Sequence, residues 1–364
     1  VVASGALLLL QAIARGFRHL AWLAVPLPPP TAGQRAVLVV ATAMFLLAPG
    51  RGRPWGRVAV GFLLFVGLEG HARLAGAPRG VLRATVLDVG QGDAILIDLP
   101  DGTALLVDGG GLVGSPVNVG ERVLVPFLRQ RRRSALRAVV LSHPHPDHFG
   151  GLLAGLDGVA VGALWDTGQG EGEGTGGPYA ALLEGMRGRG VAVLRPSALC
   201  GAFALGGAEL QVLAPCPGYE AERSANDNSF VLRITFGARS LLLTGDAELH
   251  EEAELLARGV PLAADVLKVG HHGSRTSTST PFLRAVRPRV AIASLGVRNR
   301  FGHPHGAAVE RLRSEGVPLL RTDRGGAVYV ATDGDTLTIA RPGDDDGTPL
   351  LRWPLGRGAL HGGP

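Results

Sequence analysis

The sequence is poor in cysteine and in aromatic residues, and none of its uncharged apolar runs reaches the length of a membrane-spanning helix. Cys200 and Cys216 are the only cysteines among 364 residues, too few and too far apart for a disulfide framework or a cysteine-type zinc site. We therefore expect both to be small, buried apolar side chains. Aromatic residues make up 5% and charged residues 18% of the chain, against 46% hydrophobic residues. With a mean hydropathy of +0.23, the chain is expected to include a membrane-associated part.

Length and charge set broad limits. A chain of 364 residues can hold one large domain and an additional segment, because single hydrophobic cores stop growing at roughly 250–300 residues. Lysine and arginine number 36 against 31 acidic residues, and the basic residues are overwhelmingly arginine. Arginine suits bidentate contacts to phosphate, but it is equally the residue that a GC-rich genome favours. Charge alone therefore does not decide whether the partner is a polyanion.

Residues 1–75 differ in composition from the rest of the chain. Uncharged apolar stretches at Val1–Ala14, Ala36–Gly50 and Val58–Leu68 are separated by proline-rich and arginine-containing connectors, and each is shorter than the roughly 20 residues of a membrane span. They fit the buried helices of a soluble bundle, but Trp55 and the arginines at positions 51, 53 and 57 favour a membrane hairpin with a basic turn. If that turn is cytoplasmic, the positive-inside rule places the rest of the chain on the outer face. Because the chain opens inside an apolar run, we expect it to be the C-terminal part of a longer protein.

From residue 81 short β-rich runs alternate with amphipathic helices. We expect strands at Val81–Val89, Ala94–Leu99, Ala104–Asp108, Ala138–Ser142, Ala208–Leu213, Phe230–Phe236, Ser240–Thr244, Val266–Val269 and Val290–Ala293, with a closing hairpin of Ala327–Val330 and Thr336–Ala340. We expect helices at Gly120–Arg129, from His148 onward, and at Ala247–Arg258, Thr280–Val286 and Ala307–Glu315. This alternation predicts sheets covered by helices, in a layered α/β or α+β fold.

Three regions follow from these patterns. Residues 1–75 are expected to be a membrane-associated helical segment, residues 80–342 one mixed α/β domain, and residues 343–364 a flexible tail. Within the domain, the glycine-rich stretch Thr167–Gly177 is expected to be a mobile surface loop.

Four potential metal ligands occur within six residues directly after the apolar run Ala138–Leu141. They are His143, His145, Asp147 and His148 in the pattern H-x-H-x-D-H. Imidazole and carboxylate groups are ligands that Zn²⁺ and Mn²⁺ accept. In an extended loop the first two imidazoles would face one ion, while the next two side chains turn toward a second. Such ions activate water and stabilise charge on a phosphoryl or acyl oxygen, so this pattern predicts a hydrolase with one or two divalent ions.

Further candidate residues lie at later strand or loop ends. Asp246 ends the run Leu242–Asp246, His271 and His272 follow the expected strand Val266–Val269, and His303 and His305 lie in a short proline-containing loop. Seven of the eleven histidines thus occupy three short motifs at places where ligands, rather than core residues, are expected.

The ordered set of motifs resembles one family. The set comprises Leu87–Ala94 (LDVGQGDA), Val107–Gly110 (VDGG), Ser142–Gly151, Asn226–Ser229 (NDNS), Leu243–Asp246, Lys268–Ser274 and Asn299–Pro304. In this order they resemble the C-terminal domain of the ComEC family, bacterial proteins of DNA internalisation in competence. The resemblance covers about Leu82 to Val330, and the preceding apolar segments are similar to the end of that family's membrane channel. It implies a metallo-β-lactamase αββα sandwich preceded by short transmembrane helices, with the metal site at one edge of the two sheets.

The resemblance also implies roles for individual residues. His143 and His145 would bind a first ion, Asp147 and His148 a second, Asp246 would bridge them, and one of His271 and His272 would complete the second site. Asp147, Asp246 and His303 are the expected catalytic residues. The expected substrate-binding residues are Lys268, Ser274, Asn228 and Asn299. The implied cofactor is Zn²⁺ or Mn²⁺, one or two ions per chain, and no small-molecule cofactor is expected.

One departure from the family pattern concerns the first ion. No histidine occurs between His148 and His250, so the third imidazole that many superfamily members supply is missing. We expect the Asn226–Ser229 loop or water to take its place.

Several other residues allow two interpretations. Asp88, Asp93 and Asp108 either form turns and helix caps or support the ligand loop from behind, and Gly90, Gly92, Gly109 and Gly110 fit tight turns beneath the site. Lys268 is a surface charge on a strand or a phosphate contact. The basic run Arg129–Arg133 with Arg137 is either a solvated helix end or a sequence-independent contact to nucleic-acid phosphates.

Three functions fit the sequence. The leading hypothesis is a metal-dependent phosphodiesterase, the nuclease domain of a ComEC-like DNA-uptake protein in the cell membrane, in which a metal-bound hydroxide attacks the DNA backbone. Its partners would be DNA, the membrane and other DNA-uptake components, and its domain would lie on the extracytoplasmic face. The alternatives are a hydrolase of a small phosphodiester, thioester or lactam, and a DNA-binding transport component that does not cut.

Overall fold

The computed structural model describes residues 28–47, 55–341 and 350–354, together with residues 11 and 16. The chain divides into two compact units, Val1–Leu68 and Glu69–Pro364. The predicted apolar stretch Val1–Ala14 lies outside the described residues except for Gln11, and most of the predicted tail after residue 342 does so too.

Two helices account for the second and third apolar stretches. Helix α2 (Ala32–Leu46) starts with a capping box, in which the Thr31 side chain accepts from the Gln34 amide and the Gln34 side chain accepts from the Thr31 amide. Helix α3 (Trp55–Gly76) is longer than the predicted apolar run, with 22 residues. An i,i+4 pair of Glu69 and Arg73, 3.1 Å apart, supports its last turns. Among the described helices, α3 alone has the length and apolar composition to cross a membrane.

The first sheet joins the β-meander to a parallel half. Within the described residues its nine strands follow the order β18 (Leu351–Trp353), β17 (Leu337–Ala340), β16 (Val328–Thr332), β1 (Leu82–Val86), β2 (Ile95–Asp98), β3 (Ala104–Val107), β5 (Ala138–Leu141), β7 (Ala163–Asp166) and β8 (Ala192–Leu194). Strands β3, β5, β7 and β8 are parallel. Every residue of β2, β3 and β5 is buried, as expected for continuous apolar runs in strands covered on both faces.

The second sheet has the same division into antiparallel and parallel halves. In the described part of the chain its seven strands follow the order β15 (Leu319–Arg321), β14 (Val290–Ala293), β13 (Val266–Lys268), β12 (Arg239–Leu243), β11 (Val231–Phe236), β10 (Ala208–Ala214) and β9 (Gly201–Leu205). Strands β12 to β15 are parallel. Their carboxyl ends therefore lie at one edge, where loops can place side chains together.

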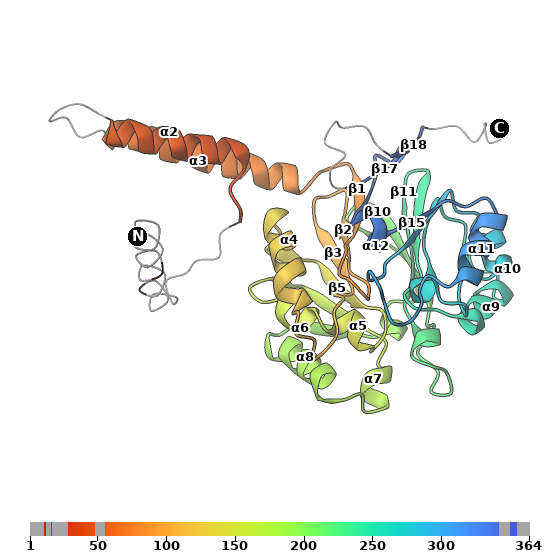
Figure 1. Cartoon of the computed structure of the whole chain (residues 1–364). Helices are drawn as coiled ribbons and strands as arrows, with labels where there is room; N and C mark the ends of the chain where they lie inside the picture. Colours follow the sequence, from red (N-terminus) through yellow and green to blue (C-terminus); the bar gives the residue numbers. More distant parts are fainter. Residues whose placement is uncertain (1–10, 12–15, 17–27, 48–54, 342–349, 355–364) are drawn as a thin grey trace, which may run out of the picture. The chain divides into compact units, whose positions relative to one another are not determined.

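The two sheets pack face to face between two layers of helices (Figure 1). One buried cluster lies between the sheets and combines residues of both, such as Val140 and Leu241. A second cluster lies under α4 (Val125–Gln130), α5 (Pro146–Phe149), α6 (Leu152–Gly155) and α8 (Gly177–Gly188). A third lies under α9 (Leu249–Ala257), α10 (Thr280–Val286) and α11 (Gly306–Ser314). The arrangement is the expected αββα sandwich of the metallo-β-lactamase fold.

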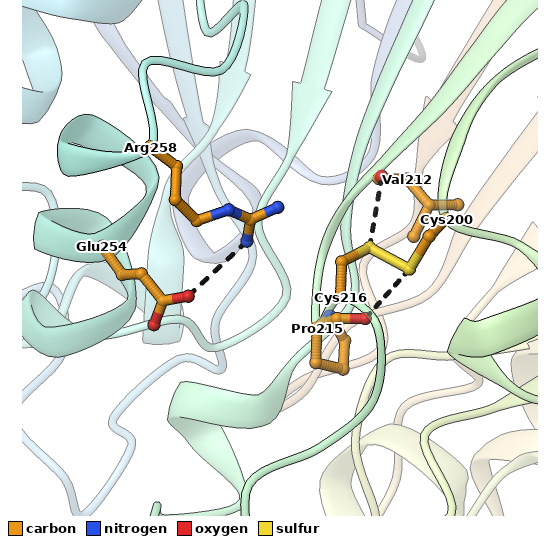
Figure 2. Close-up of a disulfide and its surroundings, with 6 residues drawn as sticks. All are labelled: Cys200, Val212, Pro215, Cys216, Glu254 and Arg258. Atoms are coloured by element: carbon orange, nitrogen blue, oxygen red, sulfur yellow. Dashed lines mark hydrogen bonds and ion pairs between the residues drawn. A yellow bond between two sulfur atoms is a disulfide. The ribbon is translucent and has the colours of Figure 1, made fainter.

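The two cysteines correct a prediction. Cys200 and Cys216 form a disulfide (Figure 2), although we expected two unlinked apolar side chains. A bridge between Cys200 and Val212 brings the chain before β9 beside β10, and Cys216 follows the end of β10. This proximity arises from tertiary pairing, which a separation of 16 residues does not reveal.

Two segments expected to be irregular are partly ordered. The glycine-rich stretch contains α7 (Gln169–Gly172), in which Gln169 is buried and donates to the Arg223 carbonyl at 3.1 Å. Part of the predicted tail forms β18, which pairs with β17. The described parts of both segments are ordered because they gain partners that are distant in sequence, and the rest of the predicted tail lies outside the described residues.

Three arginines of the basic run, Arg131 to Arg133, have internal partners and form neither a solvated helix end nor an open phosphate contact. Arg133 is buried and its Nη2 lies 2.5 Å from Asp98 Oδ1, and the Arg131 guanidinium lies 5.4 Å from the centre of the Tyr329 ring. Arg132 pairs with Glu69 at 3.3 Å. These arginines therefore bind the end of α3 and the first sheet. Two arginines of the run are exposed, Arg129 at the end of α4 and Arg137, which lies 3.6 Å from Asp101.

Candidate metal centre

The ligand loop changes conformation in its middle. After buried β5 the chain bends at residues 143 and 144, and His145 is the extended residue before α5. Pro146 then occupies the first turn of α5, where its missing N–H costs nothing. Asp147 and His148 lie in this helical turn, and the His148 ring centre lies 4.1 Å from that of His143. His148 belongs both to a group with His143 and Asp246 and to a group with Asp147 and His272, so the expected division of the four side chains between two ions stays a prediction.

His143 lies completely buried at the base of the loop. Its Nε2 is 2.9 Å from His145 Nδ1 and 3.9 Å from Asp246 Oδ2. Burial, followed by the neighbouring His148, lowers the pKa of His143 well below its ordinary value. The neutral imidazole, which is the form that binds metal ions, is therefore favoured.

His148 is oriented from behind by Asp108. Its Nδ1 lies 2.8 Å from Asp108 Oδ2, and Asp108 also accepts from the amide and the hydroxyl of Ser142, each at 2.7 Å. The Nε2 of His148 points to Asp246 Oδ2, 3.3 Å away. Burial lowers the pKa of His148, but the carboxylates of Asp246 and Asp108 outweigh it and raise this pKa well above the ordinary value. Of the two interpretations of Asp108, support for the ligand loop is the one that its contacts fit.

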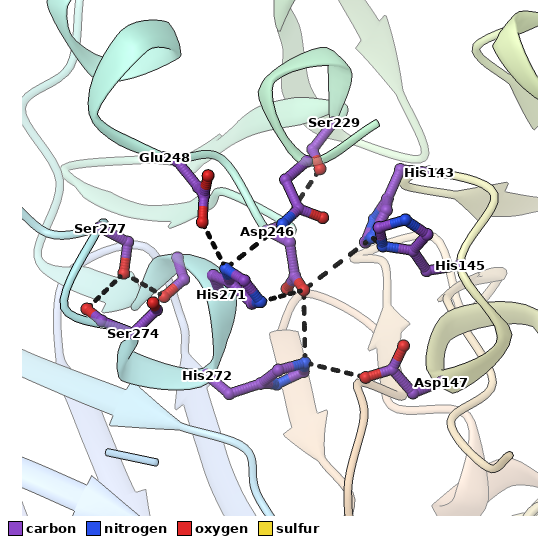
Figure 3. Close-up of polar contacts among 12 residues, drawn as sticks. His143, His145, Asp147, Ser229, Asp246, Glu248, His271, His272, Ser274 and Ser277 are labelled. Carbon is purple, nitrogen blue, oxygen red and sulfur yellow. Dashed lines mark hydrogen bonds and ion pairs between the residues drawn. The ribbon is translucent and has the colours of Figure 1, made fainter. Parts of the chain in front are cut away.

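Asp246 is the centre of the cluster (Figure 3). It follows Gly245, whose φ of 50° and close approach to Ser142 and Ser229 leave no room for a side chain. The Asp246 amide donates to Ser229 Oγ at 3.1 Å. Its Oδ2 lies within 3.9 Å of an imidazole nitrogen of each of four histidines, namely His143, His148, His271 and His272.

His271 and His272 are consecutive residues with left-handed backbones, at φ of 44° and 53°, a strained conformation that is typical of functional sites. Each is held through Nδ1. His272 Nδ1 lies 2.8 Å from the Ser294 carbonyl, and its Nε2 is 3.4 Å from both Asp147 Oδ2 and Asp246 Oδ2. His271 Nδ1 lies 2.7 Å from Glu248 Oε1. Both rings therefore direct Nε2 toward Asp246.

The residues present fit a divalent cation. Among the described residues, His148 Nε2, His272 Nε2 and Asp246 Oδ1 are buried without a hydrogen-bond partner, which is costly unless a ligand satisfies them. The ligand atoms of His143, His148 and Asp246 lie within 4.8 Å of one another, as do those of Asp147, His148 and His272. These two groups share His148, and His145 lies at the border of the first.

Comparison with known proteins agrees with this architecture. Residues 87–179 match the metallo-beta-lactamase superfamily. The chain is 33% identical over 254 residues to ComE operon protein 3 of Bacillus subtilis, covering 67% of this chain and 32% of that protein. It is 35% identical over 322 residues to Competence protein ComA of Neisseria gonorrhoeae, covering 85% and 41%, and 34% identical over 254 residues to Recombination protein 2 of Haemophilus influenzae, covering 70% and 29%.

This chain belongs to the ComEC family. The resemblance inferred from the ordered motifs is thereby confirmed. The chain spans between 29% and 41% of the length of these three relatives, so what the whole ComEC protein does is not transferred directly to it.

The four residues predicted to bind substrate from the ComEC resemblance are bonded to other residues of the chain. Lys268 is buried, with its Nζ 2.5 Å from Asp93 Oδ2, so it is neither a surface charge nor free to reach a phosphate. Asn228 is buried and accepts from the Glu220 amide at 2.8 Å. Asn299 exchanges hydrogen bonds with the backbone of His303. Ser274 is bound to Thr276 Oγ1 at 2.8 Å.

His303 and the loop before it border the centre. The centre of the His303 ring lies 5.3 Å from that of His271, and Phe301 stacks with His303 at a ring-centre distance of 5.8 Å. Burial, His272 and His271 lower the pKa of His303 to about 4, so the ring is neutral at pH 7. The predicted NDNS loop borders the site as well, through Asn226, whose Nδ2 is 3.3 Å from His271 Nδ1.

Glu248 and Ser294 were not found from the sequence. Glu248 lies two residues after Asp246 and could have been suggested by the D-x-E spacing, whereas Ser294 acts through its carbonyl, which leaves no signal in the sequence. Asp88 is exposed and accepts from the Gly90 amide at 3.2 Å, so it forms a turn, as one of its two interpretations proposed.

Proposed function

We propose that this chain is a metal-dependent phosphodiesterase, the nuclease part of a DNA-uptake protein of the cell membrane. The observation that carries the proposal is the Asp246 carboxylate, which four imidazoles approach and around which buried ligand atoms lack partners. The names of the relatives, competence and recombination proteins, support DNA as the substrate. Helix α3 supports attachment to a membrane.

The residues would divide their roles as follows. His143 and His145 would hold one divalent ion and Asp147, His148 and His272 another, with Asp246 between them. Bound Zn²⁺ or Mn²⁺ lowers the pKa of a coordinated water and neutralises charge that develops on phosphoryl oxygens. Asp108, the Ser294 carbonyl and Glu248 fix the tautomers of His148, His272 and His271, because each accepts the Nδ1 proton.

The surroundings of the centre suit a nucleic acid. His303 is neutral and half-buried beside His271, and its Nδ1 has no partner in the described part of the chain. Phe301 is 48% exposed and the Arg300 guanidinium lies 5.2 Å from its ring centre. An exposed aromatic ring next to arginine offers base stacking and a phosphate contact.

The remaining parts of the proposal concern location. We infer that α3 anchors the chain in the plasma membrane and that the hydrolase domain lies on the extracytoplasmic face. The partners would be DNA and other components of the uptake machinery.

The test is degradation of a labelled linear DNA by the purified chain with Mn²⁺ or Zn²⁺. We expect cleavage that chelation abolishes, and a loss of at least about a hundredfold in His145→Ala and Asp246→Ala, as for removal of groups that support transition-state charge. Asp157→Ala, an exposed aspartate, is the control and should cleave normally. Intact DNA with a folded, metal-loaded protein would rule out the nuclease. A small phosphodiester or thioester substrate, or DNA binding without cleavage, would then be tested.

A further inference from the structure

A groove lined by several arginines lies at the opposite ends of the strands that carry the metal centre. It encloses about 730 Å³ and is lined by part of β11, the start of β12, the residues just before β13 and β14, and the end of α10. Strand β12 begins with Arg239 in this groove, and the chain after it reaches Asp246 in the metal centre. Strand β13 begins directly after Asp265 of the groove, and the chain after it reaches His271 in the metal centre. The groove and the metal centre are therefore separated by the length of these strands.

Positive charge dominates the groove. Its lining contains four arginines, Arg233, Arg239, Arg287 and Arg289, and one acidic residue, Asp265. Asp265 Oδ1 is already shared by Arg289 Nε at 2.8 Å and Arg239 Nη1 at 3.3 Å. Gathering like charges in one concavity is unfavourable unless an anion compensates them.

Three of the four guanidinium groups have donors to offer. Arg287 is the exposed left-handed residue that ends α10, and its side chain has no hydrogen bond or ion pair within the described residues. Arg233 donates from Nε to the Ala263 carbonyl at 3.0 Å and from Nη1 to Thr235 Oγ1 at 2.9 Å. These bonds fix the plane of the guanidinium group and leave the Nη2 hydrogens for a ligand. Arg289 uses only Nε. Arg239, by contrast, is buried and bonded to Asp265 and to backbone carbonyls, so it forms the floor.

We propose that this groove, the arginine groove, binds the phosphate backbone of a nucleic-acid strand. Several arginines in fixed positions suit phosphate oxygens through bidentate contacts and read no sequence. The choice of a nucleic acid among phosphate-bearing ligands rests on the proposed function. Because the groove lies at the far ends of β12 and β13, a strand bound there is held away from the reacting atoms. The groove therefore increases affinity for long substrates and leaves the chemistry at the metal centre unchanged.

The experiment measures binding without catalysis. A fluorescently labelled single-stranded oligonucleotide is titrated with the purified full chain in EDTA, over a series of salt concentrations. We expect Arg287→Ala to reduce the slope of log K against log salt by about 0.7, which corresponds to roughly fivefold weaker binding at 0.1 M salt. The double variant Arg233→Gln/Arg287→Ala should lose about twice this slope. Arg313→Ala removes an exposed arginine on α11 that pairs with Glu310 and should bind like the parent.

Several outcomes separate the inference from the proposed function. Weaker binding in the groove variants, with unchanged metal-dependent hydrolysis of bis(p-nitrophenyl) phosphate, would support the groove. If the groove variants weaken binding of the oligonucleotide but the parent never cleaves DNA, the groove proposal is supported and the proposed nuclease function is contradicted. If the double variant binds the oligonucleotide as tightly as the parent, the groove proposal is overturned. It is also overturned if Arg313→Ala weakens binding as much as the groove variants do. Normal DNA binding together with lost association to anionic phospholipid vesicles would also overturn it, because the phosphates would then belong to lipid.

Discussion

Three imidazoles at the centre are each fixed by an atom on the far side of the ring. Asp108, the Ser294 carbonyl and Glu248 accept from the Nδ1 atoms of three different histidines. An imidazole binds a metal ion in its neutral form, which has one protonated nitrogen, so these contacts at Nδ1 would leave the Nε2 lone pair for an ion beside Asp246. A side chain or a carbonyl behind the ring thus decides which nitrogen can bind an ion.

Gly92 is the residue at which the loop before β2 meets the ligand loop. A Cβ at this position would lie 2.0 Å from the Asp147 carbonyl oxygen, and its φ is 117°. Because the opposing atom belongs to the backbone, it cannot turn aside. We expect Gly92→Ala to lower the free energy of unfolding by about 3 kcal/mol or more, measured by urea denaturation.

Gly90→Ala is the matched control for Gly92→Ala. Gly90 also has a positive φ, 72°, but nothing lies within 4 Å of its added Cβ. The free energy of unfolding of Gly90→Ala should fall by only about 1 kcal/mol, the cost of placing alanine in a left-handed backbone conformation. Equal losses in the two variants would show that the contact with Asp147 is unimportant and that backbone conformation alone matters.

At the scale of elements, Glu252 ties α9 to the start of α10. Its buried carboxylate accepts from the amides of Thr278 and Ser279, the latter at 2.8 Å. Burial raises the pKa of Glu252 to about 7, against the opposing effect of these hydrogen bonds and of Arg311. The folded state therefore holds its proton more tightly than the unfolded state. The stabilisation is complete below the unfolded pKa of 4.5 and is lost as the pH rises through about 7.

Glu252→Gln remains neutral at every pH and should lack this loss. Between pH 5 and 8, the free energy of unfolding of the parent should fall relative to that of Glu252→Gln by about 2 kcal/mol. Chemical denaturation at several pH values, in EDTA, measures the difference. Glu184→Gln, an exposed site on α8, should follow the parent. Parallel curves for Glu252→Gln and the parent would contradict a raised pKa.

Elements with strong patterns were predictable from the sequence. The expected strand Ala138–Ser142 agrees with β5 to one residue, and Val290–Ala293 is β14 without change. Residues 152–205 were mostly missed. Helix α8 contains three glycines, which weaken its helical pattern, and β8 has only partly buried residues. The disulfide and the partners of Lys268 could not be predicted because they depend on which strands become neighbours.

For the whole molecule, the metal centre is also where the two sheets are joined. Asp93, in the loop before β2 of the first sheet, pairs with Lys268 at the end of β13 in the second, and both side chains are buried. Ser294, after β14, donates its hydroxyl to the Gly92 carbonyl at 2.7 Å. The same residues that brace the ligands therefore hold the sheet edges together, so that a loss of the ion pair affects both folding and the site.

Lys268→Met tests this connection between the sheets. It would leave the Asp93 carboxylate buried without its cation, and breaking a buried pair from one side costs about 3–5 kcal/mol. The double variant Asp93→Asn/Lys268→Met removes the stranded charge and should recover most of that loss, because the remaining groups are neutral. Urea denaturation in EDTA gives both values without a contribution from bound metal. If the double variant is as unstable as the sum of the two single variants, the groups act independently and the sheets are held together by their apolar interface alone.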